Sequence, residues 1–254
     1  MGGERFPLGG NLDDCLPVEA QVALLARTLH RQGYADQLGG HISYRTDDDT
    51  LIVTPWELAW DELEPADLVR VDLAGHRLDG DLSVPGGIPL HIALHEARDD
   101  VRVIVHNHSR WGTVWCDLHR VPPAYDQSAA FTPGEPAFFD EFEHAGSIEN
   151  TRRAVAAFGD ARVGFLANHG VMVVAGSVSE AYVRAVTLEW RCRQAWVVEA
   201  AGNGLPLPPP AVELIGGGVE AGHDYVRMLF EAAARRELRL DPALRDRCAA
   251  AHRR

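Results

Sequence analysis

Hydrophobic positions along the chain follow two spacings, one typical of helices and the other typical of strands. Apolar residues three or four apart predict an amphipathic helix at residues 17–33, where proline stands at the start and glycine at the end. The same spacing predicts a second helix at residues 88–98, which leads the chain into a strand. Further helices are predicted at residues 150–158, 178–201 and 219–238.

Short runs rich in β-branched residues predict strands between these helices. The predicted strands cover residues 41–45, 51–54, 68–72, 101–105, 163–167 and 171–175. Asp47, Asp48 and Asp49 form a turn signal between the first two runs, so we expect a hairpin there. Several strands are joined too closely for parallel crossover connections. The pattern therefore predicts an α/β fold with a mostly antiparallel sheet.

Two segments carry no helix or strand pattern. Residues 119–147 are rich in proline and aromatic side chains, and a loop of that length usually serves function or packing. Residues 202–218 contain four prolines and three consecutive glycines, so we expect them to be irregular. We therefore expect one domain at residues 1–202, followed at residues 203–254 by a proline- and glycine-rich linker and a C-terminal helical appendage.

Composition narrows the classes of function. The 254 residues carry 24 basic and 37 acidic side chains, and the resulting formal net charge of −13 opposes binding to nucleic acid and to anionic membranes. A small-molecule substrate fits better. The four cysteines are scattered without a paired motif, which indicates reduced thiols. Neither a leader-like apolar run at residues 1–17 nor a membrane-length apolar stretch is evident, so we expect a cytoplasmic protein.

Three histidines are the strongest candidates for chemistry. His106 and His108 end the strand at 101–105, and residues two apart in a strand point to the same face, so both imidazoles can reach one ion. His169 lies between two apolar strands, where a solvent-seeking imidazole is unusual. Together they predict a three-histidine metal site with an open position for substrate. The alternatives are two half-buried histidines bonded to backbone and a simple turn at residues 168–170.

Two other groups of residues compete with this interpretation. His91 and His95 are four apart on a predicted helix, but Glu96 follows the second histidine, so the zinc-protease pattern is absent. We expect His91 to pack toward the sheet and His95 to be partly exposed. An aromatic cluster either belongs to the core or lines a pocket for an apolar or aromatic group. Its members are Trp56, Trp60, Trp111 and Trp115.

The order of six short motifs resembles the class II aldolase/adducin family over about residues 17–202. These motifs lie at residues 40–45, 51–55, 69–75, 90–95, 105–109 and 168–170. The resemblance implies a three-layer α/β/α fold around a mostly antiparallel central sheet, usually assembled as a cyclic homotetramer with sites at subunit interfaces. It also implies a divalent metal, generally zinc with manganese or iron(II) as alternatives, held by His106, His108 and His169.

The sequence differs from the sugar-phosphate aldolases of this family at positions that those enzymes use for catalysis and phosphate binding. Those enzymes carry a catalytic glutamate four residues before the first histidine of the helix, where this chain has Gly87. His41, Trp56 and the pair at residues 85–86 replace groups that bind phosphate in those aldolases, which disfavours a phosphorylated substrate. The helix entry at residues 87–91 is instead similar to the adducin-like, bacterial-type branch.

These features favour a metal-dependent carbon–carbon lyase, either an aldolase or a decarboxylase, that acts on an unphosphorylated hydroxy or oxo acid, aromatic acids included. Decarboxylation requires no base to remove a carbon-bound proton, so the absent glutamate matters less for it. A residue that delivers or removes a proton is still needed. The candidate catalytic residues are His41, Tyr125 and Glu135, with Asp126 and His223 as further candidates.

Two other hypotheses compete with the lyase. The fold has been recruited for non-haem iron oxygenases, although three histidines without a carboxylate depart from the usual iron(II) site. A non-catalytic adducin-like module would retain the metal for structure alone. Structural zinc typically has four protein ligands, however, and the sequence supplies three evident ones.

Overall fold

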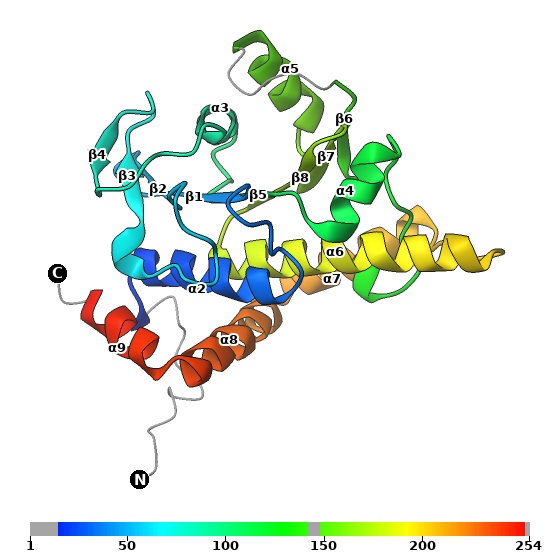
Figure 1. Ribbon diagram of the computed structural model, residues 1–254. Coiled ribbons are helices and arrows are strands. Elements are labelled where there is room, and N and C mark those ends of the chain that lie inside the picture. Colours follow the sequence, from blue (N-terminus) through cyan, green and yellow to red (C-terminus); the bar gives the residue numbers. More distant parts are fainter. Residues whose placement is uncertain (1–14, 142–147, 252–254) are drawn as a thin grey trace.

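The computed structural model describes residues 15–141 and 148–251, in which helices cover both faces of one mixed sheet (Figure 1). The strands are β1 (His41–Arg45), β2 (Leu51–Val53), β3 (Val69–Val71), β4 (Arg77–Asp79), β5 (Val103–Asn107), β6 (Ala137–Phe139), β7 (Val163–Leu166) and β8 (Gly170–Ala175). The helices are α2 (Val18–Arg31), α3 (Ile88–Ala97), α4 (Arg110–Asp117), α5 (Ile148–Phe158), α6 (Val178–Ala201), α7 (Pro209–Ala221), α8 (His223–Leu240) and α9 (Pro242–Ala251). All six predicted strands are present, whereas β4, β6, α4, α7 and α9 were not predicted.

The eight strands follow the order β4-β3-β2-β1-β5-β8-β7-β6. Every neighbouring pair is antiparallel except β6 and β7, which are parallel. Helices α2 and α6 lie along one face of the sheet, and α3 and α5 lie over the other (Figure 1). The predicted three-layer α/β/α fold with a mostly antiparallel sheet is confirmed.

The two faces of the central strand β5 enter different parts of the core. Val103 and Val105 belong to the apolar cluster between the sheet and helices α2 and α6. Ile104 belongs to the cluster on the opposite face, beneath α3 and α5. Because side chains alternate along a strand, His106 shares the face of Ile104. The first histidine of the candidate site therefore lies in the layer between the sheet and α3.

The prediction that residues 202–218 are irregular is wrong for its second half, because helix α7 begins at Pro209. Pro209 and Pro210 occupy the first turn, where a helix needs no backbone N–H donors. Gly216 faces Pro133, and a Cβ there would lie 2.5 Å from the Pro133 nitrogen. Close packing against this loop thus overrides the low helix propensity of the glycine run.

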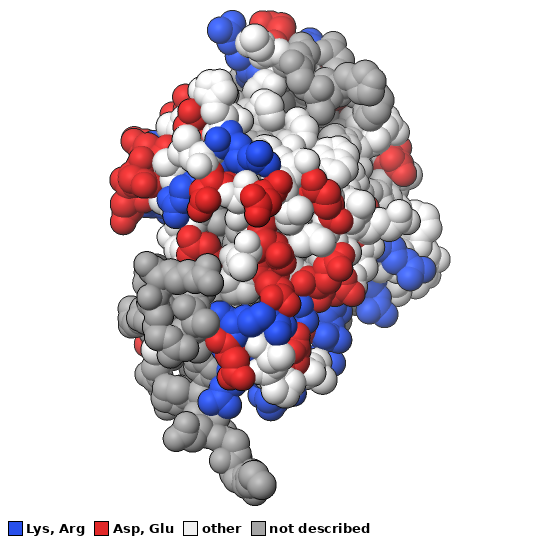
Figure 2. Space-filling view, turned by 60° about the vertical axis from the view of Figure 1, so that its left-hand side comes forward, with Lys and Arg blue, Asp and Glu red and all other residues white. Residues whose placement is uncertain are grey.

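The surface reflects the acidic composition. On the face shown in Figure 2, acidic side chains form broad patches that arginines interrupt. All four cysteines are free, as predicted, and Cys116, Cys192 and Cys248 are buried. Among the helices in the described residues, none combines the length and the apolar character that crossing a membrane requires.

Replacing Gly216 with alanine is expected to lower the free energy of unfolding by about 1–3 kcal/mol, because the new Cβ would overlap the Pro133 backbone. Gly217→Ala is the matched control in the same helix, since nothing lies within 4 Å of its Cβ position. The control should gain about 0.5–1 kcal/mol from higher helix propensity. Urea denaturation measures both values, and equal effects would contradict the packing argument.

Candidate metal centre

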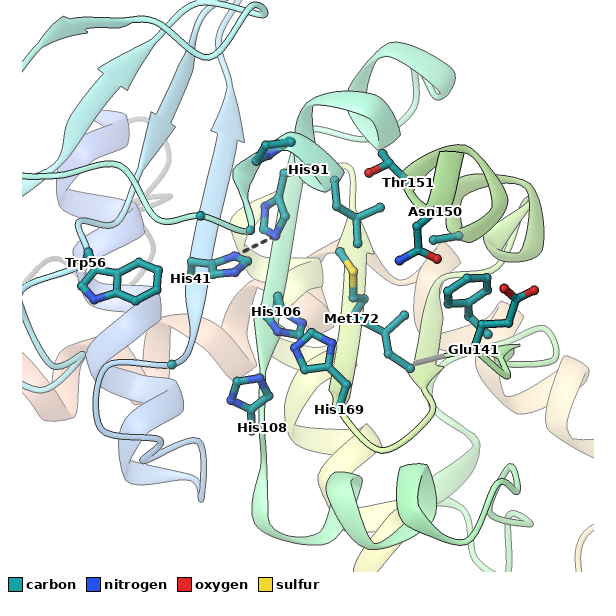
Figure 3. Close-up of a pocket in the computed structure, with 18 residues that line it drawn as sticks. His41, Trp56, His91, His106, His108, Glu141, Asn150, Thr151, His169 and Met172 are labelled. Atoms are coloured by element: carbon teal, nitrogen blue, oxygen red, sulfur yellow. Dashed lines mark hydrogen bonds between the residues drawn. The ribbon is translucent and has the colours of Figure 1, made fainter. Parts of the chain in front are cut away.

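His106, His108 and His169 come together at one point beside the sheet (Figure 3). Their nearest ring nitrogens all lie within 4.8 Å of one another. The ring centroids of the three pairs are 4.8–5.0 Å apart. Strand β5 supplies His106, the residue just after its end supplies His108, and the β7–β8 turn supplies His169. The structure therefore brings together the three histidines that the sequence singles out.

Hydrogen bonds orient two of these rings from behind. The Nδ1–H of His106 donates to the Val171 carbonyl oxygen over 3.1 Å. The Nδ1 of His108 lies 2.7 Å from Oδ2 of Asp36, which also accepts the backbone N–H of His108. The Nε2 of His108 is buried without a hydrogen-bond partner. An orphaned imidazole nitrogen that faces two other histidines fits a metal ligand, since such ligands usually bond through their second nitrogen to an orienting acceptor.

The local sequence around His169 explains how the turn places it. Asn168 adopts a left-handed conformation with φ of 52°, which asparagine tolerates better than most residues. A Cβ at Gly170 would lie 2.7 Å from both the Asn107 carbonyl oxygen and Cδ2 of His108. Only glycine therefore lets the turn approach the end of β5 so closely, which accounts for the Asn-His-Gly pattern.

Burial favours the neutral form of two of these imidazoles, His106 and His169. It lowers the pKa of His169 to about 4 and holds the pKa of His106 well below its usual range. Neighbouring histidines lower both pKa values further. A metal ligand must be a neutral imidazole, so these two rings have the protonation state that divalent metals require.

A cavity of about 270 Å³ opens in front of the three histidines (Figure 3). Its lining is formed by Gly39, His41, Trp56, Gly86, Gly87, Pro89, Leu90, His91, His106, His108, Phe139, Glu141, Asn150, Thr151, Ala154, Leu166, His169 and Met172. Most of the wall opposite the histidines is apolar, and no arginine or lysine is among these described lining residues. A substrate anion would thus depend on the metal for charge compensation.

Two further histidines lie against the cavity. His41 lines it and bonds through Nδ1 to Nε2 of His91 over 3.0 Å. His41, one of the candidate catalytic residues, therefore lies at the cavity, and its catalytic role stays a prediction. A Cβ at Gly87 would lie 2.2 Å from Nε2 of His41. The glycine at position 87 therefore makes room for this imidazole.

The expectation that His95 is partly exposed is wrong, whereas His91 packs toward the sheet as expected. His95 is completely buried, with its Nε2 2.9 Å from Ser43 Oγ and its Nδ1 3.2 Å from the Val101 carbonyl oxygen. The sequence suggested exposure because histidine is polar, but these two partners satisfy both ring nitrogens.

The structure does not bring Tyr125 or Glu135 to the cavity of their own chain. Tyr125 packs beside Gly204, next to the end of α6, and Glu135 is exposed. Asp126 accepts hydrogen bonds from Trp190 and from the Ala129 backbone. The side chain of His223 lies outside the described residues. A catalytic role for these four residues stays a prediction.

The sequence left open whether the four tryptophans of the aromatic cluster belong to the core or line a pocket, and the structure shows both. Trp56 is half exposed and lines the cavity. Trp115 is fully buried, with its indole N–H donated to the Cys192 carbonyl oxygen, and Trp60 donates to the Gly40 carbonyl oxygen. Trp111 packs against the same core. Trp56 alone among these four belongs to the site.

Several cavity residues escaped the sequence analysis. Phe139 and Glu141 come from the segment around β6, and Asn150 and Thr151 come from α5. No periodic signal marks them, because they reach the site through long-range packing of α5 over the sheet. Met172 pairs with His106 in the antiparallel register of β5 and β8, and the sequence alone does not give this register.

The comparison with known families agrees with this geometry. Residues 20–196, more than two thirds of the chain, match the family described as Class II Aldolase and Adducin N-terminal domain. The chain belongs to this family. A solved structure of an aldolase II superfamily protein from Pseudomonas syringae superposes with a TM-score of 0.80 at 25% identity. The match covers 91% of this chain and 98% of that one.

Two relatives within the family show how varied its chemistry is. The chain is 30% identical over 203 residues to 3,4-dihydroxyphthalate decarboxylase of Arthrobacter keyseri, which covers 72% of this chain and 79% of the relative. It is 26% identical over 200 residues to the 4-hydroxy-3-prenylphenylpyruvate oxygenase/4-hydroxy-3-prenylbenzoate synthase of Streptomyces roseochromogenus subsp. oscitans, which covers 76% and 72%. Membership of the family therefore fixes the fold and leaves the reaction open.

Removing the carboxylate behind His108 should weaken metal binding. Asp36→Ala is expected to lower the zinc affinity of the protein by about 10- to 100-fold, because the His108 ring loses the acceptor that orients it. Competition with a chromophoric chelator measures the affinity. Asp61→Ala is the control, since Asp61 lies 3.7 Å from the surface residue His30. A loss of similar size in both variants would contradict the orienting role.

Buried His95 should make the metal-free protein sensitive to acid. Burial lowers its pKa from 6.5 to about 4 in the folded chain, so below pH 6.5 the unfolded chain binds the additional proton. The free energy of unfolding should thus fall as pH drops from 6.5 toward 4, by up to about 1.4 kcal/mol per pH unit from this residue. His95→Gln should flatten that slope in urea denaturation at several pH values. An unchanged slope would contradict the attribution of this acid sensitivity to His95.

Proposed function

We propose that this chain is a metal-dependent carbon–carbon lyase that decarboxylates an unphosphorylated hydroxy acid, with aromatic acids as the preferred class. The observation that carries the proposal is the cluster of His106, His108 and His169 at the base of a cavity that also receives His41. The same metal centre would serve an aldolase, so the remaining lining decides between the two reactions.

Three features support decarboxylation of an unphosphorylated acid. Gly87 supplies no carboxylate to remove a carbon-bound proton, and decarboxylation does not need one. The described lining contains no cationic side chain for a phosphate, while a single carboxylate can be bound by the metal alone. The relative that shares 30% identity is named for decarboxylation of 3,4-dihydroxyphthalate.

In the proposed decarboxylation, different residues would bind the metal, exclude water and hold a proton. His106, His108 and His169 would hold the metal, which when bound supplies a positive charge that stabilises the electron pair left by departing carbon dioxide. The apolar wall of Leu90 and Met172 excludes water from the carboxylate, which favours its loss as a neutral gas. His41 faces the same space and would hold a proton released by a substrate hydroxyl until the vacated carbon takes one up.

An oxygenase is the second candidate. The oxygenase relative belongs to the same family, and three histidines leave coordination positions for both substrate and oxygen. The metal distinguishes the two functions, because oxygen chemistry of this kind requires a redox-active ion such as iron(II), whereas decarboxylation proceeds on zinc or manganese.

We further propose that the chain assembles as a homo-oligomer, a tetramer by analogy with the family. Support comes from the C-terminal half of α6, which projects beyond the sheet layer (Figure 1). Its exposed side chains include Trp190, Trp196 and Val197, large apolar groups that a partner subunit would cover. Sedimentation of the purified protein tests this assembly.

Protein purified without added metal is expected to contain about one zinc or manganese ion per chain by elemental analysis. It should release carbon dioxide from 3,4-dihydroxyphthalate or a related dihydroxybenzoic acid and leave L-fuculose 1-phosphate intact. His106→Ala should lose the metal and reduce carbon dioxide release to background, whereas the surface variant His30→Ala should retain both.

Three outcomes of that experiment would count against the proposal. Stoichiometric iron together with oxygen consumption would favour the oxygenase. A protein without metal would contradict both candidates, and full activity in His106→Ala would show that the three-histidine centre is not the active site.

A further inference from the structure

A continuous chain of hydrogen bonds runs from the cavity into the core behind it. His41 and Ser43 alternate on one face of β1, and His91 and His95 lie one turn apart on the facing side of α3. The His41 Nδ1 is 3.0 Å from His91 Nε2, and the His91 Nδ1 is 2.8 Å from Ser43 Oγ. The same hydroxyl lies 2.9 Å from His95 Nε2. Figure 3 shows the first of these contacts, at the cavity wall.

The hydrogen bond at the buried end of this series fixes which atom donates and which accepts in the other bonds. The Val101 carbonyl oxygen can only accept, so Nδ1 of His95 must carry the hydrogen that joins them over 3.2 Å. In a neutral imidazole the other nitrogen then accepts, and the Ser43 hydroxyl donates to Nε2 of His95. Ser43 has one hydrogen, so its oxygen accepts from Nδ1–H of His91. Each bond thus determines the next one toward the cavity.

These donor and acceptor roles hold when the imidazoles of His91 and His95 are neutral, and their surroundings favour the neutral form. Ser43, His91 and His95 are completely buried, and no carboxylate bonds to either ring in the described residues. A charged imidazole there would be desolvated without compensation. Burial accordingly lowers the pKa of His95 to about 4 and holds the pKa of His91 well below its usual range.

The last bond of the series reaches the cavity. Nε2 of His91 accepts, so Nδ1 of His41 donates, and Nε2 of His41 is left with a lone pair. No group in the described part of the chain bonds to that nitrogen, and it lies against Gly87. His41 is 7% exposed and lines the cavity, so its free acceptor is available to a bound molecule.

We infer that the relay of His91, Ser43 and His95 locks His41 as a hydrogen-bond acceptor, which selects substrates that present a hydroxyl group beside Gly87. This inference rests on the proposed function for the rest of the substrate, the acid group that the metal would bind. His91, Ser43 and His95 are positioning residues, since they act through His41. An anionic oxygen at the same place would face a lone pair, so the carboxylate of the substrate must turn away from His41.

The first test reads the tautomers directly in the zinc-loaded protein. Long-range ¹H–¹⁵N correlation spectra should show His41, His91 and His95 protonated at Nδ1 and unprotonated at Nε2. In Ser43→Ala, His95 should keep its tautomer, whereas His41 and His91 should lose their single preference. Thr28→Val is the control, because it removes a buried hydroxyl that bonds only within α2.

Two results of the spectrum would overturn the relay. One is a His41 that is protonated or metal-bound at Nε2 in the native protein. The other is an unchanged pair of tautomers at His41 and His91 in folded Ser43→Ala. If that variant does not fold, the spectrum of the native protein decides alone, since the relay requires all three rings to share one tautomer.

The second test asks whether the acceptor selects a hydroxyl. Calorimetry compares 3-hydroxybenzoate with benzoate, two acids that share a carboxylate and differ by one hydroxyl. The zinc-loaded protein should bind the hydroxy acid about two- to tenfold more tightly, the value of one hydrogen bond. The preference should vanish in His41→Phe, shrink in Ser43→Ala and persist in Thr28→Val.

The outcomes separate this inference from the proposed function. If both acids bind equally to the native protein, the hydroxyl selection by His41 is wrong while the acid-binding metal centre stands. If neither acid binds, the proposed function and the hydroxyl selection fail together, and the tautomer spectrum still decides the relay.

Discussion

Pairing of β1 with β5 is the constraint on which the rest of the site depends. The antiparallel register sets His41 opposite His106 and Ser43 opposite Ile104, so the side chains of both strands alternate in step. This register places His106 of the metal centre and His41 and Ser43 of the relay on the same face of the sheet, beneath α3. A slip of β1 by one residue would turn His41 and Ser43 toward α2 and α6 and separate them from His106.

Hydrogen bonding of the buried imidazoles also explains why the histidine rings between the sheet and α3 adopt one arrangement. A neutral imidazole has one donor and one acceptor, and an unpaired nitrogen in the core costs about 1–3 kcal/mol. Backbone carbonyls of Val171 and Val101 anchor His106 and His95, and the carboxylate of Asp36 anchors His108. At His106 and His108 these acceptors leave Nε2 for the cavity, whereas Nε2 of His95 bonds to Ser43. The protein thus builds a reactive surface from groups whose far sides are satisfied by the fold.

Much of this could be read from the sequence, because both periodicities are local. Strand alternation relates His41 to Ser43 and His106 to His108, and helical spacing relates His91 to His95. What the sequence lacks is the meeting of these faces, which depends on strand register and on where α3 packs. The same limit applies to Glu141 and Thr151, which reach the cavity from distant segments. Helix α7 was missed because packing against Pro133 outweighs glycine propensity.

Gly87 and His41 are best understood as one feature of the cavity wall. A side chain at position 87 would begin 2.2 Å from the imidazole of His41, so the two positions cannot both carry large groups. A glutamate at position 87 would thus displace His41 and break its bond to His91. With glycine there, the cavity wall presents an imidazole whose free nitrogen accepts. Such a cavity suits a substrate that brings its own hydroxyl group to His41, beside an acid group that the metal would bind.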